Sequence, residues 1–538
     1  SAQYIKDGLS NGEDFFYVTT IITVIAMNEE TLFNRMHAIS SMFEDMDMEC
    51  VPANFHQEDA FLGTLPLCKV PDTIFALGHR NMLTSGAASL YPFASYELMD
   101  DNGILMGTNL TNGSLVMPDV FDTARYKNAN MYICGSSGAG KTYNMLVQAL
   151  HTREAGIQVF IIAPLKGKEF KRSCDAIGGQ FIRIAPGSPH CINVMAIRKN
   201  DERTAMVSKI LDSDDMEESI LSEKISSLET LFEIMVPDIS NEEEQLLNGH
   251  MMQTYRKFGI TDDNASLIDP ENPGEYRLMP TLRDLSDDME DDPRMTRIRN
   301  IMSKYVTGSA KNFSEQTNVS LDNKYIVIDL SAFERNKKML PIAMYIALDF
   351  ILDKVKEDRT QNKRVFIDEI WRLVGKGATE EAAQAVLEMF KTFRGYGAGA
   401  VAVTQELADF FALDEGSYAQ AILNSCSMGM IMSTEPVALN LLRHNLDLEQ
   451  REVDIVQGLE RGQALLVGSG SSVAIKIVSS KLEHQLITTD FHELNSMVDE
   501  RMQELEEEET LLTPGEQMIA SRRGSPQLIP MSRKKIKL

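Results

Sequence analysis

The sequence predicts an α/β fold built around a parallel sheet, and three observations support this prediction. From Asn128 onward, short apolar runs alternate with stretches of helical periodicity. The runs are almost continuously apolar, as strands buried on both faces of a parallel sheet must be. A glycine-rich loop connects the first run to the first helical stretch. The runs occupy residues 131–134, 158–163, 325–330, 364–368, 399–404 and 427–433.

Changes in composition divide the 538 residues, which are too many for one ordinary domain. Residues 14–27 are apolar and β-branched enough for a strand, and residues 28–47 follow with a helical period. Asn102-Gly103 and Asn112-Gly113 separate short apolar runs, a pattern typical of β-hairpins. We predict an N-terminal α+β domain (1–80), a β-hairpin connector (81–127), the first part of the α/β domain (128–200), an acidic all-α insertion (201–304), the second part of the α/β domain (305–495) and a charged, largely disordered tail (496–538).

Charge and cysteine usage restrict the function classes. A net charge of −27 argues against a surface that coats nucleic acid, because such surfaces carry a basic stripe. Residues 201–300 hold 25 acidic and 10 basic side chains, and a solvated helical face is the simplest interpretation of this segment. The six cysteines form no CxxC pair, which is typical of reduced thiols in a cytosolic protein. The apolar stretch at residues 17–27 has about half the length needed to span a bilayer.

A phosphate-binding motif follows the first apolar run. It fits GxxxxGK[ST] and lies between the strand-like NMYIC and the helical YNMLVQALHT, so a merely structural glycine turn is disfavoured. Its glycines let successive backbone N–H groups point at a β-phosphate, supported by the helix N-terminus. We expect Lys141 to neutralise the β- and γ-phosphates and the Thr142 hydroxyl to bind Mg²⁺. The predicted nucleotide-binding residues are Gly135, Ser136, Ser137, Gly138, Ala139, Gly140, Lys141 and Thr142.

Two later apolar runs end in polar side chains that fit the same chemistry. RVFIDE ends in Asp368 and Glu369. In a P-loop protein, an acid at this position completes the Mg²⁺ coordination, which predicts Asp368 as a metal ligand beside Thr142. Glu369 is placed to polarise the attacking water as a general base, although without the P-loop the pair would indicate only a polar strand end. Gln405 ends the next run and is expected to contact the γ-phosphate or the water; a solvated amide is the alternative.

Two arginines are candidates for completing a neighbouring subunit's site. Arg394, in KTFRGYGAG, lies at a predicted helix end and is the first candidate for an arginine finger. Arg461, in GLERGQAL, is the second, and an ordinary surface arginine is the alternative for both. Glu169, in PLKGKEF, is a further candidate for a nucleotide contact or a hinge. The nearby aromatic side chains are interpreted as core: Phe366, Trp371, Phe390 and Phe393.

Several longer stretches between residues 14 and 495 match one known family. They are QEDAFLGTLPL (57–67), NANMYICGSSGAGKTYNM (128–145), TGSAKNFSEQTNVSLDNKYIVIDLS (307–331), RVFIDEIWRLVG (364–375), FRGYGAGAVAVTQELADFFALDEG (393–416) and LEHQLITTDFHEL (482–494). In these stretches the chain resembles the conjugative-transfer and type IV secretion ATPases of the VirB-four class, including TraC-like and TraE-like proteins. Several of the stretches have no counterpart in generic P-loop NTPases, which makes the resemblance specific.

The resemblance implies a RecA-like P-loop NTPase domain with a helical insertion and an N-terminal α+β domain, which here is expected to be shortened. The family's functional residues fall on Lys141, Thr142, Asp368, Glu369, Arg394 and Gln405. One departure is Ala163-Pro164, where many members have Asp-Pro; Glu169 remains available nearby. The resemblance further implies ATP and Mg²⁺, assembly with itself into a hexamer or dimer-based hexamer, and inner-membrane channel components and a coupling ATPase as partners. It places the protein in the cytoplasm at the inner face of the cell membrane.

The function predicted from these features is ATP hydrolysis that powers channel or pilus assembly and the transfer of a DNA–protein substrate. The alternative is a DNA translocase or coupling-type ATPase that pumps DNA through a hexameric ring. A DNA pump should line its pore with Lys and Arg, and a coupling protein normally has transmembrane helices; the sequence gives no hint of either. A scaffold with vestigial hydrolysis is disfavoured by the intact Glu369. DNA binding is therefore expected to be weak or indirect.

Overall fold

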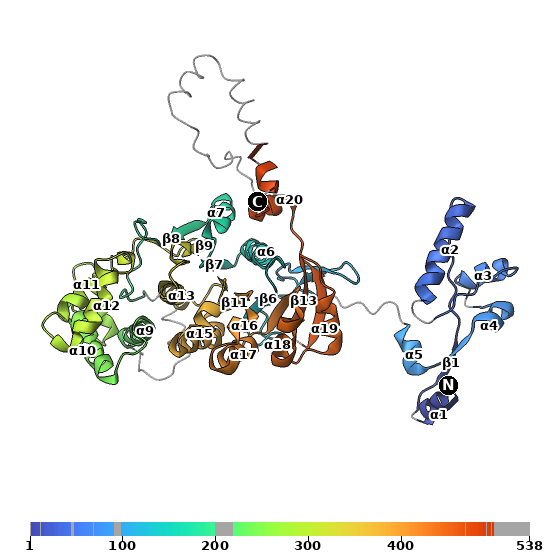
Figure 1. Ribbon diagram of the computed structural model, residues 1–538, viewed down its shortest axis with the longest axis horizontal. Coiled ribbons are helices and arrows are strands. Elements are labelled where there is room, and N and C mark those ends of the chain that lie inside the picture. Colours follow the sequence, from blue (N-terminus) through green and yellow to red (C-terminus); the bar gives the residue numbers. More distant parts are fainter. Residues whose placement is uncertain are drawn as a thin grey trace, which may run out of the picture. The chain divides into compact units, whose positions relative to one another are not determined.

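The computed structural model describes residues 2–10, 12–44, 48–67, 69–90, 98–198, 219–468, 470–490, 492–496 and 498–499. The chain forms two compact units, Ser1–Tyr96 and Glu97–Leu538 (Figure 1). The start of the predicted acidic insertion (201–218) and the predicted tail beyond residue 499 lie outside the described residues. In the part of the chain that the structure describes, no helix combines the length and the hydrophobicity needed to cross a membrane.

The N-terminal unit is a small α+β unit. Its elements are α1 (Ala2–Ser10), β1 (Phe15–Val18), α2 (Glu29–Glu44), α3 (Gln57–Thr64), α4 (Asp72–Gly78), β2 (Arg80–Leu83) and α5 (Thr84–Ser89). β1 and β2 pair antiparallel, with Phe15 opposite Leu83. The predicted strand at 14–27 is therefore much shorter, since its four-residue partner offers no hydrogen bonds beyond Val18. Because β2 begins at Arg80 and is the partner of β1, this unit extends to Tyr96 and not to residue 80.

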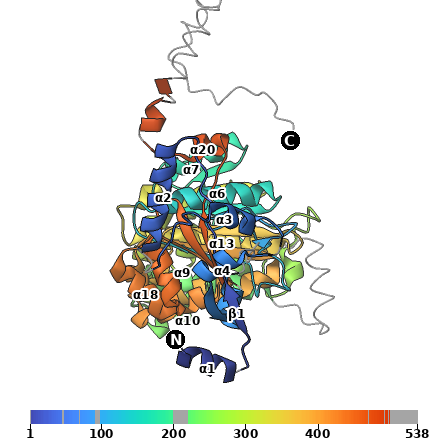
Figure 2. The same ribbon diagram turned by 90° about the vertical axis from the view of Figure 1, so that its right-hand side faces the viewer.

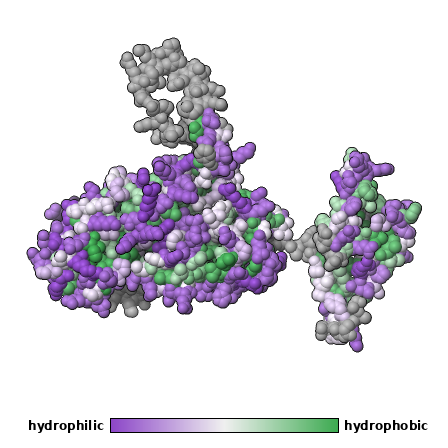
Figure 3. All heavy atoms as spheres, in the orientation of Figure 1, coloured by the Kyte–Doolittle hydropathy of each residue, from purple (hydrophilic) through white to green (hydrophobic). Residues whose placement is uncertain are grey.

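Most large apolar side chains of this unit are exposed. Among its described residues, the buried hydrophobic side chains are Ile74 and Leu83. Met27 and Phe55 are 99% and 96% exposed, and Figure 3 shows apolar side chains spread over the surface of the unit. The core that this unit forms by itself is therefore small.

The second unit is organised around a 12-stranded sheet. Each of the six apolar runs in the sequence forms a strand, which confirms the predicted α/β fold class. These strands are β6 (Met131–Cys134), β7 (Gln158–Ala163), β9 (Tyr325–Asp329), β10 (Lys363–Ile367), β11 (Ala398–Thr404) and β12 (Met428–Met432). All of them are completely buried, as expected for strands covered by helices on both faces.

The strand order is β3-β5-β4-β14-β13-β12-β6-β11-β10-β7-β9-β8. The strands not yet described are β3 (Leu98–Met99), β4 (Gly107–Asn109), β5 (Leu115–Met117), β8 (Gln180–Arg183), β13 (Gln463–Gly468) and β14 (Ser471–Lys476). Pairing is parallel from β12 through β8, whereas β13, β14 and β4 extend the sheet antiparallel beyond β12. The sheet is thus parallel in the part that the apolar runs predicted and mixed as a whole.

The predicted β-hairpin connector belongs to this sheet. β4 and β5 pair antiparallel across Asn112-Gly113, where Gly113 has a φ of 73° that suits glycine. β4 also pairs with β14, through Asn109 and Ile475. The hairpin is therefore an edge of the second unit's sheet, and not a separate connector, because β14 offers it a free edge that the sequence pattern does not reveal.

Helices cover both faces of the sheet, with α6 and α7 on one side and α13 and α15 on the other (Figure 1). Their bounds are α6 (Lys141–Glu154), α7 (Gly167–Ala176), α13 (Met339–Glu357) and α15 (Glu380–Thr392). Alternate strand residues face the two layers, so Ile133 packs in the cluster that contains α6, and Tyr132 and Cys134 in the cluster that contains α13. A final helix, α20 (Lys481–Ile487), lies against α6 and α7 in both views (Figure 2).

The described part of the acidic insertion is built from helices. They are α9 (Ile220–Met235), α10 (Asn241–Lys257), α11 (Leu282–Asp288) and α12 (Thr296–Val306). α10 begins with a capping box between Ser240 and Glu243, and three glutamates occupy its first turn. Negative side chains at a helix N-terminus stabilise the positive end of the helix dipole, so part of the acidity serves helix formation.

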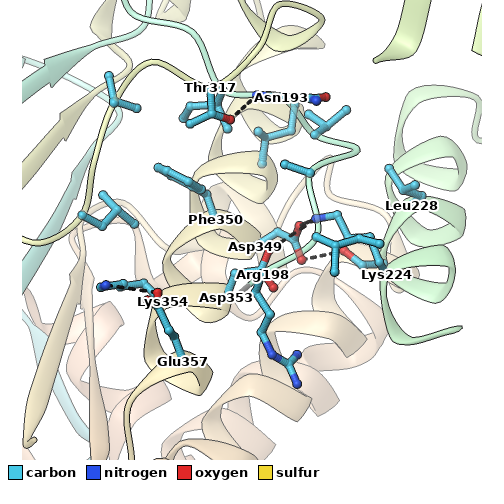
Figure 4. A pocket seen from close by; sticks show the side chains of 18 of the residues that line it. Asn193, Arg198, Lys224, Leu228, Thr317, Asp349, Phe350, Asp353, Lys354 and Glu357 are labelled. Carbon is cyan, nitrogen blue, oxygen red and sulfur yellow. Dashed lines mark hydrogen bonds and ion pairs between the residues drawn. The ribbon is translucent and has the colours of Figure 1, made fainter. Parts of the chain in front are cut away.

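A buried ion-pair cluster joins α9 to α13 (Figure 4). Lys224 Nζ lies 2.8 Å from Asp349 Oδ2 and 3.5 Å from Asp353 Oδ2, beside a cavity of about 420 Å³. Ser227 donates a hydrogen bond of 2.6 Å to the other Asp349 oxygen. Burial alone would lower the pKa of Lys224, but the two carboxylates raise it above its ordinary value. The lysine therefore stays charged and ties the insertion to the sheet domain.

Replacing Lys224 with methionine should lower the free energy of unfolding by about 3 kcal/mol, because two buried carboxylates lose their counter-charge. Urea denaturation measures this loss. A variant that also carries Asp349→Asn and Asp353→Asn should recover most of it, since neutral amides need no buried cation. Equal stability of the single variant and the wild type would show that the cluster contributes nothing to the junction.

Candidate nucleotide-binding site

Strand order brings the predicted site residues to one edge of the sheet. β11 lies between β6 and β10 and is parallel to both, with Thr404 opposite Cys134 and Ala402 opposite Ile367. The loop after β6, the residues after β10 and Gln405 after β11 therefore emerge side by side. This is the edge at which open α/β sheets bind ligands.

The glycine-rich loop after β6 leads into an uncapped helix. Gly138 and Gly140 have φ angles of 82° and 98°, in the region that favours glycine. No side chain caps the N-terminus of α6, and its first turn contains no acidic residue. Lys141 is 7% exposed, and its Nζ donates to the Ser136 carbonyl oxygen at 2.5 Å, so the loop curls around the lysine. Free N–H groups, the helix dipole and this lysine fit a polyphosphate.

The loop rests on the segment that follows β12, a contact that the sequence analysis missed. The Ser136 N–H donates to the Ser433 carbonyl oxygen at 2.9 Å, and the Glu435 N–H donates to Ser136 Oγ at 2.9 Å. A Cβ on Gly135 would lie 2.9 Å from Met432 Cβ, so only glycine fits at this point. The apolar run at 427–433 marks the strand, but nothing in the sequence indicates that β12 pairs directly with β6.

Asp368 and Glu369 lie at the end of β10, where the chain turns sharply. Glu369 has a φ of 50° and is 5% exposed. Gln405 Nε2 donates a hydrogen bond to Glu369 Oε1, so the structure brings these two predicted residues together. Trp371 Nε1 donates to Glu369 Oε2 at 2.6 Å. The half-buried ring of Trp371 packs against the core, as predicted, but its N–H is directed to the site, which the sequence did not indicate.

Burial changes the acidity of the charged groups at this edge. Burial, together with the neighbouring Glu369 carboxylate, raises the pKa of Asp368 to about 7. Burial also raises the pKa of Glu369, and it lowers the pKa of Lys141. Glu369 is buried and Asp368 is half-buried, and the positive charges near them are Lys141 and Arg372. The carboxylates of Asp368 and Glu369 and the hydroxyl of Thr142 are hard oxygen donors, which are the ligands that Mg²⁺ prefers. These residues therefore fit a Mg²⁺–nucleotide.

The two candidate arginines lie at opposite ends of the parallel strands. Arg394 is exposed in a short helix, Phe393–Tyr396, before the amino end of β11. Because the seven residues of β11 span about 23 Å, Arg394 cannot reach the P-loop of its own subunit. Arg461 precedes Gly462, whose N–H donates to the Ala139 carbonyl oxygen at 3.4 Å. Arg461 therefore lies beside its own P-loop, and of the two candidates it is the one that the structure brings to the site within one subunit.

Glu169 and an aspartate that the sequence analysis missed lie on the other side of Asp368. Glu169 is in the first turn of α7, and its charge raises the pKa of Asp368. Asp329 is buried at the end of β9 and packs against Gly167, where a Cβ would lie 1.9 Å from Asp329 Oδ1. In the sequence, Asp329 stands out by its place near the end of the apolar run 325–330. The run alone does not show which strand lies next to β7.

The chain has the fold of a P-loop NTPase, since a strand, a glycine-rich loop and a helix present a buried lysine beside an Asp-Glu pair on a parallel sheet. Residues 279–478 match the family described as the TraG P-loop domain. Within the class, the chain is 22% identical over 430 residues to protein TraC of Escherichia coli (strain K12). This match covers 77% of the chain and 45% of TraC, so the chain spans less than half the length of that relative.

The fold is also that of a solved VirB4. The structure of VirB4 of Thermoanaerobacter pseudethanolicus aligns with a TM-score of 0.61 and 23% identity, covering 72% of this chain and 100% of that chain. The plasmid coupling protein TrwB in complex with ADP and Mg²⁺ aligns with a TM-score of 0.43 and 13% identity, over 72% of this chain and 97% of TrwB. The resemblance to the VirB-four class is confirmed by the TraC and VirB4 matches together with the TraG P-loop domain.

Proposed function

We propose that this protein is the ATPase motor of a conjugative or type IV secretion system. It hydrolyses ATP to power channel or pilus assembly and the transfer of a DNA–protein substrate. The observation that carries the proposal is the convergence of the P-loop, Asp368 and Glu369 at one sheet edge, in a chain similar to TraC.

The chain's own residues divide the chemistry among them. Lys141 and the N–H groups at the start of α6 bind and neutralise the phosphates. Thr142 and Asp368 would hold Mg²⁺, which when bound neutralises negative charge on the phosphates. Glu369 accepts the proton of the attacking water, and its burial excludes other water from the carboxylate. Gln405, hydrogen-bonded to Glu369, is placed to contact the γ-phosphate and to report its presence.

The assembly and the location belong to the same proposal. The protein works as a hexamer or dimer-based hexamer at the cytoplasmic face of the inner membrane. It contacts membrane components of the channel and a coupling ATPase. The similarity to TraC and to VirB4 supports this proposal, and so does the position of Arg394, which needs a neighbouring subunit to serve an active site.

DNA binding should be weak and strongly dependent on salt, because the chain carries a net charge of −27. For duplex DNA, each neutralised phosphate changes the logarithm of affinity by about −0.9 per tenfold increase in salt. Fluorescence anisotropy of labelled duplex over a salt series measures this slope.

Phosphate release measured over a range of protein concentrations, with and without DNA, tests the function itself.

Two outcomes separate the proposal from the translocase alternative. The proposal predicts phosphate release that rises in specific rate with protein concentration and is insensitive to duplex DNA. Tight binding of duplex DNA at physiological salt, together with DNA-stimulated hydrolysis, would favour a translocase that pumps DNA through its ring.

A further inference from the structure

We propose that Trp371 is a positioning residue that holds the carboxylate of Glu369 in the orientation needed for a general base. This inference rests on the proposed ATP hydrolysis. Trp371 is the only tryptophan in the 538 residues and begins α14 (Trp371–Val374). Its indole N–H donates to Glu369 Oε2 at 2.6 Å, so it contacts the proposed base directly.

The backbone fixes Glu369 but leaves its side chain free to rotate. The Ile370 N–H donates to the Val403 carbonyl oxygen at 3.1 Å, and the Arg372 N–H donates to the Glu369 carbonyl oxygen at 3.0 Å. These bonds hold the left-handed conformation at Glu369, which few non-glycine residues adopt. The three side-chain torsions of a glutamate remain, and hydrogen bonds to its two oxygens must set them.

The two donors to Glu369 differ in what else they can do. Gln405 donates to Oε1 through an amide that is also placed to contact a γ-phosphate. Trp371 has one N–H, no acceptor and a rigid ring, so it holds Oε2 while leaving that oxygen a lone pair for a proton. The guanidinium of Arg372 lies 4.5 Å from the ring centroid and restrains the ring by a cation–π contact. When Gln405 turns to the phosphate, Trp371 is the donor that keeps the base in place.

Trp371→Phe should lower kcat by about tenfold or more, because a hydrogen bond to a charged group is lost. The Kd and KM for ATP should stay within about twofold of wild type, since the lost hydrogen bond goes to Glu369 and not to the residues that bind the phosphates. A second variant replaces tryptophan biosynthetically with benzothienylalanine, which keeps the ring shape and has sulfur in place of the N–H. Because the chain has one tryptophan, this replacement changes position 371 alone and should give the same loss.

Tryptophan fluorescence gives a second readout, and it would not respond to a change at Glu369 if Trp371 had only a structural role. Tryptophan emission comes from Trp371 alone, so Glu369→Ala, which removes the hydrogen-bond acceptor, should shift it. Tyr418→Phe, which removes one hydroxyl from a half-buried aromatic ring in α17 (Ser417–Asn424), is the matched control and should change neither kcat nor emission.

Three results would overturn the inference. They are an unchanged kcat in both tryptophan variants, a loss of kcat that only follows a loss of ATP binding, and an emission spectrum that Glu369→Ala leaves unchanged. If wild-type protein releases no more phosphate than Lys141→Ala protein, the proposed function fails instead. The emission shift then still shows whether Trp371 holds Glu369.

Discussion

Glu369→Gln should bind ATP normally and release phosphate at less than about one hundredth of the wild-type rate. One positioned general base is typically worth about a hundredfold or more, and the amide cannot accept the proton. The amide is nearly isosteric and can still accept the hydrogen bond from Trp371, so the site should stay assembled. The variant should therefore trap ATP. A rate within about threefold of wild type would show that Glu369 is not the base.

Lys141→Ala is the matched variant, because it should abolish turnover by a different route. The lysine is buried against the glycine-rich loop, and its loss removes the charge that binds the phosphates. Bound nucleotide, measured after rapid gel filtration, should be retained by Glu369→Gln and absent from Lys141→Ala. Equal retention by the two variants would contradict the division of roles between them.

Arg394→Ala should keep nucleotide binding and lose hydrolysis. We expect Arg394 to complete the active site of the neighbouring subunit. Arg394 precedes the amino end of β11, whereas the P-loop lies at the opposite edge of the sheet. Residues at opposite edges meet in a head-to-tail contact, and such contacts close into rings when the rotation permits. Specific activity should therefore fall sharply on dilution, because each site is complete only at an interface. Phosphate release over a dilution series measures this.

Mixing variants separates action in trans from action within one subunit. Arg394→Ala mixed with Lys141→Ala should regain part of the activity, since a mixed interface pairs an intact P-loop with an intact arginine. Lys141→Ala mixed with Glu369→Gln is the control and should stay inactive, because both residues serve the site of their own subunit. Full-rate hydrolysis by monomers, or an inactive Arg394 mixture in rings shown to be mixed, would contradict the trans role and leave Arg461 as the candidate.

The features that sequence predicted best are local. The P-loop and the paired Asp368 and Glu369 depend on residue order over a few positions, together with the apolar strands that precede them. Their meeting at one edge follows from parallel strands, whose carboxyl ends share an edge. Gln405 is placed beside Glu369 for the same reason, since β11 and β10 are neighbours.

The features that sequence did not predict depend on pairing between distant segments. β13 and β14 extend the sheet beyond β12, and the hairpin β4–β5 joins them; no short-range pattern specifies these partners. The hydrogen bond of Trp371 was missed because an aromatic residue four positions after a buried strand is usually core. The chain turns through a left-handed residue at Glu369, and the indole N–H then donates to the carboxylate of that residue. The boundary at residue 80 was wrong because β2, which begins there, pairs with β1 across most of the N-terminal unit.

The most direct test of the central claim is the rate of phosphate release by wild-type protein at saturating ATP and Mg²⁺, measured beside Lys141→Ala protein purified in the same way. The central claim is that the P-loop edge of this sheet hydrolyses ATP. It predicts continuous release by the wild type that stops when Mg²⁺ is chelated, and background release by the variant. Equal rates for the two proteins would contradict it, because the activity would then not arise at this site.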